Sequence, residues 1–240
     1  MSEPWRAVVR AYECDFFGHV NNAVYLSYLA EATVRAGGQA CAGWQLRGLS
    51  IEYHTPALPG DELAVHVWRP PASDPDGVTC AYDVRRAGDG AAIVTAQIVW
   101  DAGTTPAATI PAGDAPAPVK PLRLAEPAFA GRPFTWSHTV RYYELDQCGR
   151  ASSVDLLRWL AEAKFVACAE VGWALEDLPA RDLLILQVRH DLSCYGELHA
   201  GDEVTVRSWV CEMRKVRGTW RQEVYAGGRT VDYDCPLERM

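Results

Sequence analysis

Hydrophobic and polar residues follow the same order of patterns in two parts of the chain, and no periodicity survives in the stretch between them. Alternating apolar and polar residues predict strands, and apolar residues at helical spacing predict one helix in each part. The elements expected in the first part are a strand at 5–13, a helix at 23–36 and strands at 49–53, 62–68, 78–86 and 91–100. In the second part they are a strand at 134–143, a helix at 154–170 and strands at 184–194, 204–211, 219–225 and 230–237.

The first predicted helix is apolar over most of its surface. Its polar residues fall at Ser27, Glu31 and Arg35, so that they form one narrow stripe along the helix. Such a helix must be covered nearly all round by other elements. Asn21 or Asn22 is a suitable N-cap, because an asparagine side chain can accept a hydrogen bond from the first free amides.

The two parts of the chain are copies of one another. Nine residues of the first strand, the following turn and the helix recur 131 positions later. They are Arg10, Tyr12, Glu13, Asp15, Gly18, Leu29, Ala30, Glu31 and Ala32, which return as Arg141, Tyr143, Glu144, Asp146, Gly149, Leu160, Ala161, Glu162 and Ala163. The sequence therefore predicts two domains, 1–101 and 134–240, joined by a proline- and alanine-rich connector at 102–133.

A long, mostly buried helix in a unit with five strands suggests a curved antiparallel sheet wrapped around that helix, which resembles the hot-dog fold. The segment D-F-F-G-H-V-N-N-A-V-Y-L-S-Y-L-A-E, which starts at Asp15, resembles the signature of the 4-hydroxybenzoyl-CoA thioesterase group of acyl-CoA thioesterases. It is also similar to the D-x-N-x-H-V-N-N segment of plant acyl-ACP thioesterases, which carry two hot-dog units in one chain. The resemblance implies an α+β double hot-dog fold, with a five-stranded antiparallel sheet around a long central helix in each unit.

The same resemblance implies roles for individual residues. In the family, the acid at this place is the nucleophile or general base, which assigns the role to Asp15, and the histidine of the plant enzymes corresponds to His19. Their middle asparagine corresponds to Phe17, so the plant triad is not reproduced here. No metal or other cofactor is implied. The residues of this segment expected to bind substrate are Gly18, Val20, Asn21, Asn22 and Tyr25.

Thioester hydrolysis needs a group that attacks the carbonyl carbon, or activates water to do so, and a place for the oxyanion. Asp15 follows a predicted strand and can do either. The amides at 18–22 open the helix, where the positive end of its dipole could bind the oxyanion. The structural alternatives are that Asp15 is a turn or capping acid, that His19 is a half-exposed turn residue, and that both asparagines serve first as caps.

The second copy keeps Asp146 and Gly149, but G-H-V-N-N has become G-R-A-S-S at 149–153. The sequence S-S-V-D at 152–155 still fits a capping box, so the helix start is preserved although the histidine is lost. We therefore expect one competent site, built on Asp15, with the second copy supplying the opposite wall. Asp146 is the alternative candidate.

Composition and charge exclude several classes of function. The net charge is −8 and no basic stretch is longer than R-K-V-R at 214–217, which argues against nucleic acid as a partner. No apolar run is long enough for membrane insertion, and the first residues lack a signal-peptide core, so a cytoplasmic protein is expected. Eight scattered cysteines without a C-x-x-C pair argue against a disulfide framework or a zinc site.

The resemblance to acyl-CoA and acyl-ACP thioesterases implies an acyl-CoA or acyl-carrier-protein substrate as the partner. A homo-oligomer of double hot-dog chains is compatible with the sequence, because paired hot-dog units commonly assemble further. Two other functions remain as alternatives. One is a hot-dog dehydratase or hydratase acting on acyl thioesters, and the other is a non-catalytic acyl-binding protein.

Overall fold

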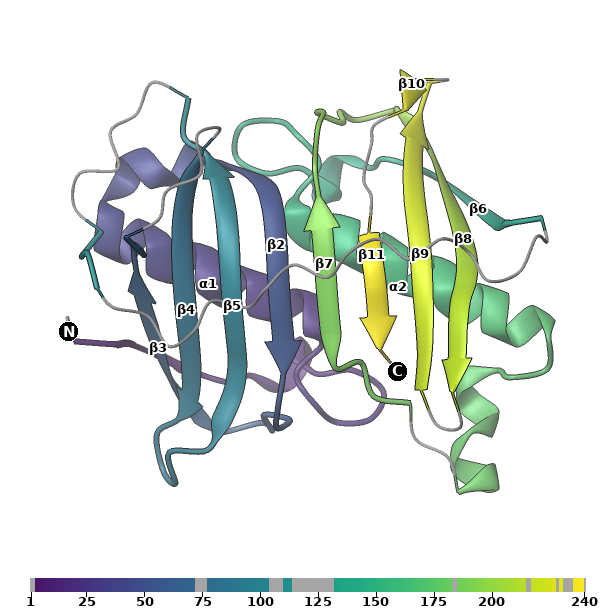
Figure 1. Cartoon of the computed structure of the whole chain (residues 1–240), viewed down its shortest axis with the longest axis horizontal. Helices are drawn as coiled ribbons and strands as arrows, with labels where there is room; N and C mark the ends of the chain where they lie inside the picture. Colours follow the sequence, from purple (N-terminus) through teal and green to yellow (C-terminus); the bar gives the residue numbers. More distant parts are fainter. Residues whose placement is uncertain are drawn as a thin grey trace. The chain divides into compact units, whose positions relative to one another are not determined.

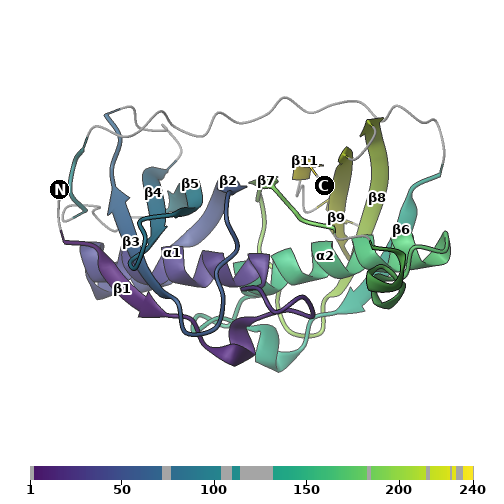
Figure 2. The same cartoon turned by 90° about the horizontal axis from the view of Figure 1, so that it is seen from below.

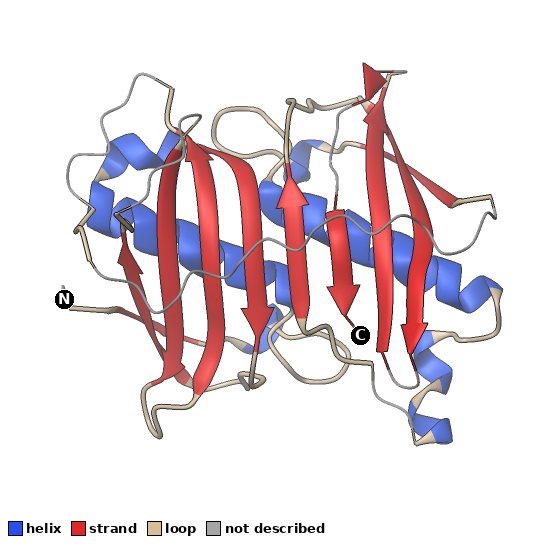
Figure 3. Ribbon diagram, viewed as in Figure 1, coloured by secondary structure: helices blue, strands red, loops and turns tan. Residues whose placement is uncertain are grey.

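The structure is a computed structural model that describes residues 3–71, 77–103, 110–113, 132–182, 185–214, 217–227, 229–230 and 235–239. The chain divides into two compact units, Met1–Pro121 and Leu122–Met240. Each unit combines antiparallel strands with one long helix among its described residues (Figures 1 and 3). This confirms the expectation of antiparallel sheets with few helices.

In the first unit, the strands form an antiparallel sheet in the order β1-β3-β4-β5-β2. Helix α1 (Asn22–Gly37) lies along one face of this sheet and contacts β1 and β3 (Figure 2). Leu29 of the helix is fully buried, as are Ile51, Val84 and Ile98 of the strands. The core therefore lies between α1 and the sheet. The strands are β1 (Trp5–Val8), β2 (Gln45–Tyr53), β3 (Glu62–Trp68), β4 (Val78–Arg86) and β5 (Ala92–Asp101).

Helix α1 has the surface that its sequence pattern predicts. Ser27 and Arg35 are exposed and Glu31 is half-buried, while most other residues of the helix are buried. Arg35 and Glu31 form an ion pair at 2.7 Å. At the end of the helix, Gly38 adopts φ +86°, a conformation that favours glycine and stops the helix.

The second unit repeats this plan. Its strands pair antiparallel in the order β6-β8-β9-β11-β7, and β10 pairs with β9. Helix α2 (Ser153–Glu170) contacts β6 and β8. The strands are β6 (Phe134–Thr139), β7 (Arg189–Ser193), β8 (Glu203–Arg214), β9 (Arg217–Ala226), β10 (Arg229–Thr230) and β11 (Cys235–Arg239).

Several predicted strands differ in length from the observed ones. The strand expected at 5–13 ends at Val8, and a 3₁₀ turn, η1 (Ala11–Glu13), follows it. The strand expected at 134–143 likewise ends at Thr139 and is followed by η3 (Tyr142–Glu144). Strand β2 begins four residues earlier than expected, and β7 covers only part of 184–194.

Among the described residues, three further short 3₁₀ turns, besides η1 and η3, were also not predicted. They are η2 (Gln39–Gly43), η4 (Leu175–Asp177) and η5 (Pro179–Arg181). Most of the predicted connector at 102–133 lies outside the described residues, as does the 231–234 part of the last predicted strand.

In the described parts of the chain, no helix combines the length and apolar character that crossing a membrane requires.

Candidate active site

The turn between β1 and α1 is organised around the carboxylate of Asp15. Its Oδ1 accepts hydrogen bonds from the amides of Phe17 at 2.9 Å and His19 at 3.4 Å. The Asp15 amide donates to the carbonyl oxygen of His19 at 2.8 Å, which closes the turn. Gly18 adopts φ +77°, a left-handed conformation that favours glycine. A Cβ there would meet no atom within 4 Å, so the backbone conformation and not lack of space accounts for glycine at this position. Oδ1 therefore has the turn-forming role that is common for aspartate.

A neighbouring carboxylate fixes the turn to the helix. Glu13 Oε2 accepts hydrogen bonds from the Arg10 amide and from the Tyr28 hydroxyl, both at 2.7 Å. Its carbonyl oxygen accepts from the amide of Asn21 at 2.9 Å. Burial and the hydrogen bond to Glu13 raise the pKa of Tyr28, so this hydroxyl stays protonated and donates. The turn thus has little freedom to move relative to α1.

Most of the amides expected to form an oxyanion site are already used within the chain. The amides of residues 18–21 donate to oxygens of the turn and of neighbouring segments. The Asn21 side chain accepts from the amide of Ala23 at 2.9 Å and is the N-cap, as predicted. Asn22 differs, because neither its backbone nor its side-chain N–H groups have an acceptor among the described residues. Of the amides at 18–22, that of Asn22 is therefore the one still available among the described residues for the expected oxyanion site, which stays a prediction.

Val20 and Tyr25, both expected to contact substrate, are buried side chains with exposures of 2% and 3%. The Tyr25 hydroxyl accepts from the Ala57 amide at 3.3 Å, and its ring centroid lies 5.8 Å from that of Tyr53. Burial raises the pKa of Tyr25 to about 12. Both side chains therefore pack beneath the turn, and their expected contacts with substrate stay a prediction.

The second unit repeats the turn with one difference at the carboxylate. Asp146 Oδ1 accepts from the amides of Cys148 at 2.8 Å and Arg150 at 3.0 Å. The Arg150 guanidinium also donates to Asp146 Oδ2, at 3.2 and 3.3 Å. At the place of Arg150 the first unit has His19. Neither the His19 imidazole nor Asp15 Oδ2 has a hydrogen-bond partner among the described residues.

Segment 15–22 therefore presents three groups without a described partner. They are a carboxylate oxygen on Asp15, the imidazole of His19 and the N–H groups of Asn22. A carboxylate oxygen can accept a proton, an imidazole can accept or donate one, and an amide at a helix N-terminus stabilises an anion. In the described residues, no group of three or more histidine, cysteine, aspartate or glutamate side chains is arranged to hold a metal ion.

Two acids that shape these turns were missed from the sequence, Glu13 and its counterpart Glu144. Glu144 is buried and accepts hydrogen bonds from His138 at 2.8 Å and from Trp159 Nε1 at 3.0 Å. Burial alone would raise the pKa of Glu144, but the hydrogen bonds outweigh it and the pKa is lowered. Each acid stands three residues after an arginine, which is the spacing of a capping box, so the sequence carried a usable signal.

Comparison with known proteins relates the chain to thioesterases. Residues 2–102 match the sequence model of the acyl-ACP thioesterase C-terminal domain, although they form the N-terminal part of this chain. A comparison with curated proteins gives no match.

Three solved structures resemble almost the whole chain. A protein described as an oleoyl thioesterase from Lactobacillus plantarum has a TM-score of 0.71 and 16% identity, covering 99% of this chain and 96% of that one. An acyl-ACP thioesterase from Bacteroides thetaiotaomicron has a TM-score of 0.71 and 18% identity, with coverages of 98% and 96%. The 12:0-ACP thioesterase from Umbellularia californica has a TM-score of 0.74 and 15% identity, with coverages of 98% and 92%. These likenesses show the fold, and with the family match they support the expected enzyme class, a hydrolase.

Proposed function

We propose that the protein is a double hot-dog thioester hydrolase that releases a free carboxylic acid from an acyl-carrier-protein or acyl-CoA substrate. The proposed hot-dog units are 1–101 and 134–240, joined by the connector at 102–133. Support comes from the family match at residues 2–102 and from the thioesterase structures that resemble nearly the full chain. Support also comes from the different surroundings of two aspartates that otherwise occupy the same turn.

The proposed reaction uses Asp15 Oδ2 as its base. A water molecule attacks the thioester carbonyl carbon while Oδ2 takes its proton, and the oxyanion of the tetrahedral intermediate accepts from an N–H of Asn22. The carbon–sulfur bond then breaks, the free acid forms and the thiolate leaves with a proton from His19. In the alternative, Oδ2 itself attacks the carbonyl carbon and water then hydrolyses the resulting anhydride.

The observation that carries this assignment is the difference at Oδ2. In both turns Oδ1 accepts two backbone amides, which is a structural role. Among the described residues, a guanidinium holds Oδ2 of Asp146, within 3.3 Å of Arg150, but not Oδ2 of Asp15. An ion-paired carboxylate is a poorer base and nucleophile than a free one, because the paired cation stabilises its charged form. We therefore place the chemistry at Asp15 and give Asp146 a structural role.

The test is thiol release from a panel of acyl-CoA and acyl-carrier-protein thioesters, followed with a disulfide reagent. Asp15→Asn and Asp146→Asn form a matched pair, because asparagine keeps the Oδ1 acceptor of the turn. Asp15→Asn should lower kcat by about 100-fold or more while the midpoint of urea unfolding stays close to that of the wild type. Asp146→Asn should retain most of the activity.

The reverse pattern, or equal loss in both variants, would overturn the assignment to Asp15. Binding of a thioester without turnover would support the acyl-binding alternative. Addition of water across an enoyl thioester without thiol release would support the hydratase alternative. A single turnover in ¹⁸O-labelled water tests the nucleophilic route. If Asp15 attacks directly and water then attacks the Asp15 Cγ of the anhydride, the label appears in the Asp15 carboxylate, whereas water attack on the thioester places it in the released acid.

A further inference from the structure

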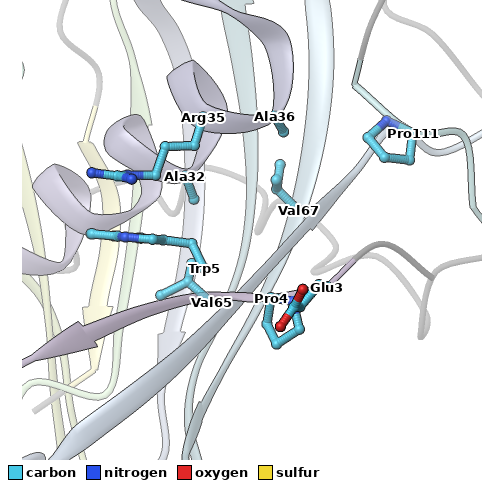
Figure 4. A pocket seen from close by; sticks show the side chains of 9 residues that line it. All are labelled: Glu3, Pro4, Trp5, Ala32, Arg35, Ala36, Val65, Val67 and Pro111. Atoms are coloured by element: carbon cyan, nitrogen blue, oxygen red, sulfur yellow. The ribbon is translucent and has the colours of Figure 1, made fainter.

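The first unit has a second feature suited to a ligand, a hollow of about 350 Å³. It lies beside the last turns of α1 and is bounded by β1, β3 and the chain at Pro111 (Figure 4). Along the helix, Ala32 is ten residues beyond Asn22, which is about 15 Å at 1.5 Å per residue. The hollow is therefore separate from the Asp15 turn. Its walls include the apolar residues Pro4, Trp5, Ala32, Val65 and Val67.

Among the described residues, one cation lines this hollow, the guanidinium of Arg35. Its Nε donates to Glu31 at 2.7 Å, and its Cζ lies 5.1 Å from the centroid of the Trp5 ring. These contacts hold the planar group in place. Its two Nη atoms have no partner among the described residues, so their N–H groups remain available. An arginine presented in this way suits a carboxylate, because its paired donors match the two carboxylate oxygens.

In the described part of the lining, the one acid is Glu3, which lies beside Pro4 and away from the Arg35 guanidinium (Figure 4). Its negative charge disfavours a ligand carboxylate at that end, so the two charged residues together select an orientation. The cation is particular to the first copy, because the residue 131 positions after Arg35 is Val166. Apolar walls with a single cation at one end fit an amphipathic anion.

We propose that this hollow binds an aliphatic monocarboxylic acid, with the hydrocarbon chain against the apolar walls and the carboxylate on Arg35. At about 30 Å³ for each water-sized group, the hollow accepts on the order of ten heavy atoms, and its size is within the usual range of small-molecule sites. The site goes beyond the proposed hydrolysis, since it uses none of the residues of the Asp15 turn.

The test is calorimetric titration of the full chain with decanoate, kept below the concentration at which it forms micelles. Decanol is the uncharged comparison. We expect saturable binding of decanoate with one ligand per chain, and weaker binding of decanol. Arg35→Gln should weaken decanoate binding by about threefold or more, as for a partly exposed ion pair, without affecting decanol. The matched control is Arg158→Gln, which removes an exposed arginine of α2 that pairs with Asp155 at 2.8 Å.

Two further variants test the location. Ala36→Phe should block the hollow and lower binding of both ligands, while Glu3→Gln should tighten decanoate binding. Asp15→Asn should leave binding unchanged, which separates this site from product binding at the proposed catalytic turn. Absence of saturable decanoate binding would overturn the proposal, as would equal effects of Arg35→Gln and Arg158→Gln. Neither result would bear on thiol release, so the hydrolase proposal stands or fails separately.

Discussion

The His19→Arg substitution gives the first turn an arginine at the position that corresponds to Arg150 in the second turn. The two turns share their backbone geometry, since Gly18 and Gly149 have φ of +77° and +78°. The amide two residues after the aspartate donates to Oδ1 at 2.9 Å in one turn and 2.8 Å in the other. An arginine at 19 should therefore reach Asp15 Oδ2 as Arg150 reaches the corresponding oxygen of its own turn.

The size of the expected effect can be estimated from the ion pair between Asp146 and Arg150 in the second unit. The Asp146 and Arg150 side chains are 32% and 17% exposed, so the pair is partly screened by solvent. Such a pair contributes up to about 1 kcal/mol to the free energy of unfolding. Its effect on chemistry is expected to be larger, because a positioned base contributes about 100-fold or more to the rate. His19→Arg should thus lower kcat by about that factor beyond the loss of the His19 proton donor, which His19→Gln measures by itself, while stability is kept or slightly raised.

The assay combines thiol release with urea unfolding of the same preparations. His19→Gln is the necessary control, because it removes the imidazole without adding a cation. If His19→Gln keeps much more activity than His19→Arg, the additional loss of kcat is explained by pairing of the new guanidinium with Asp15 Oδ2. Equal loss in the two variants would refute this reasoning and assign the effect to the imidazole itself. Full activity in His19→Arg, with the new ion pair seen in its crystal structure, would refute the role of Asp15 Oδ2.

Three further outcomes are expected from the contacts of single residues. Gly18→Ala should lower the free energy of unfolding in urea by about 1–2 kcal/mol, because it strains a residue at φ +77° without a steric clash. Tyr82→Phe should cost about 1–3 kcal/mol in the same assay, because it removes the hydroxyl that accepts from buried Trp100 Nε1 at 2.8 Å. The lowered pKa of Glu144 means that its contribution is present above the unfolded value of 4.5 and is lost as pH falls through the folded pKa. Glu144→Gln should therefore flatten the pH dependence of unfolding below about pH 5, whereas an unchanged slope would contradict the assigned hydrogen bonds.

The features predicted well from the sequence are those fixed by neighbouring residues. The N-caps at Asn21 and Ser152 depend on bonds to amides two or three residues away. The capping box expected at Ser152 is only half formed, because the Ser152 amide donates to the carbonyl oxygen of Glu144 and not to Asp155. The hairpin of β4 and β5 depends on alternation and on a short glycine-containing turn. The strand expected at 5–13 was too long, because alternation does not show that the Glu13 side chain turns back to the Arg10 amide and starts a 3₁₀ turn.

The candidate site was less predictable, because which of its groups are free depends on the hydrogen-bond partners that side chains and amides find in the folded chain. The sequence shows histidine in one copy and arginine in the other, but not that Arg150 donates to the aspartate four residues before it. It also does not show that the amides of residues 18–21 are consumed within the fold. Burial of Tyr25 beneath the turn arises from packing against Tyr53, a residue on a strand far along the chain.

Comparison of the two copies of the turn distinguishes two roles of the aspartate. One is the Oδ1 acceptor that the turn needs, and the other is the negative charge. Because Oδ1 forms the same two amide contacts in both copies, the turn alone accounts for an oxygen acceptor at positions 15 and 146. Asparagine supplies that acceptor equally well, so the turn does not require a charge. In the second copy, the charge is matched by Arg150. In the first copy, no described cation pairs with Asp15, so its Oδ2 is available for the role as base that we propose.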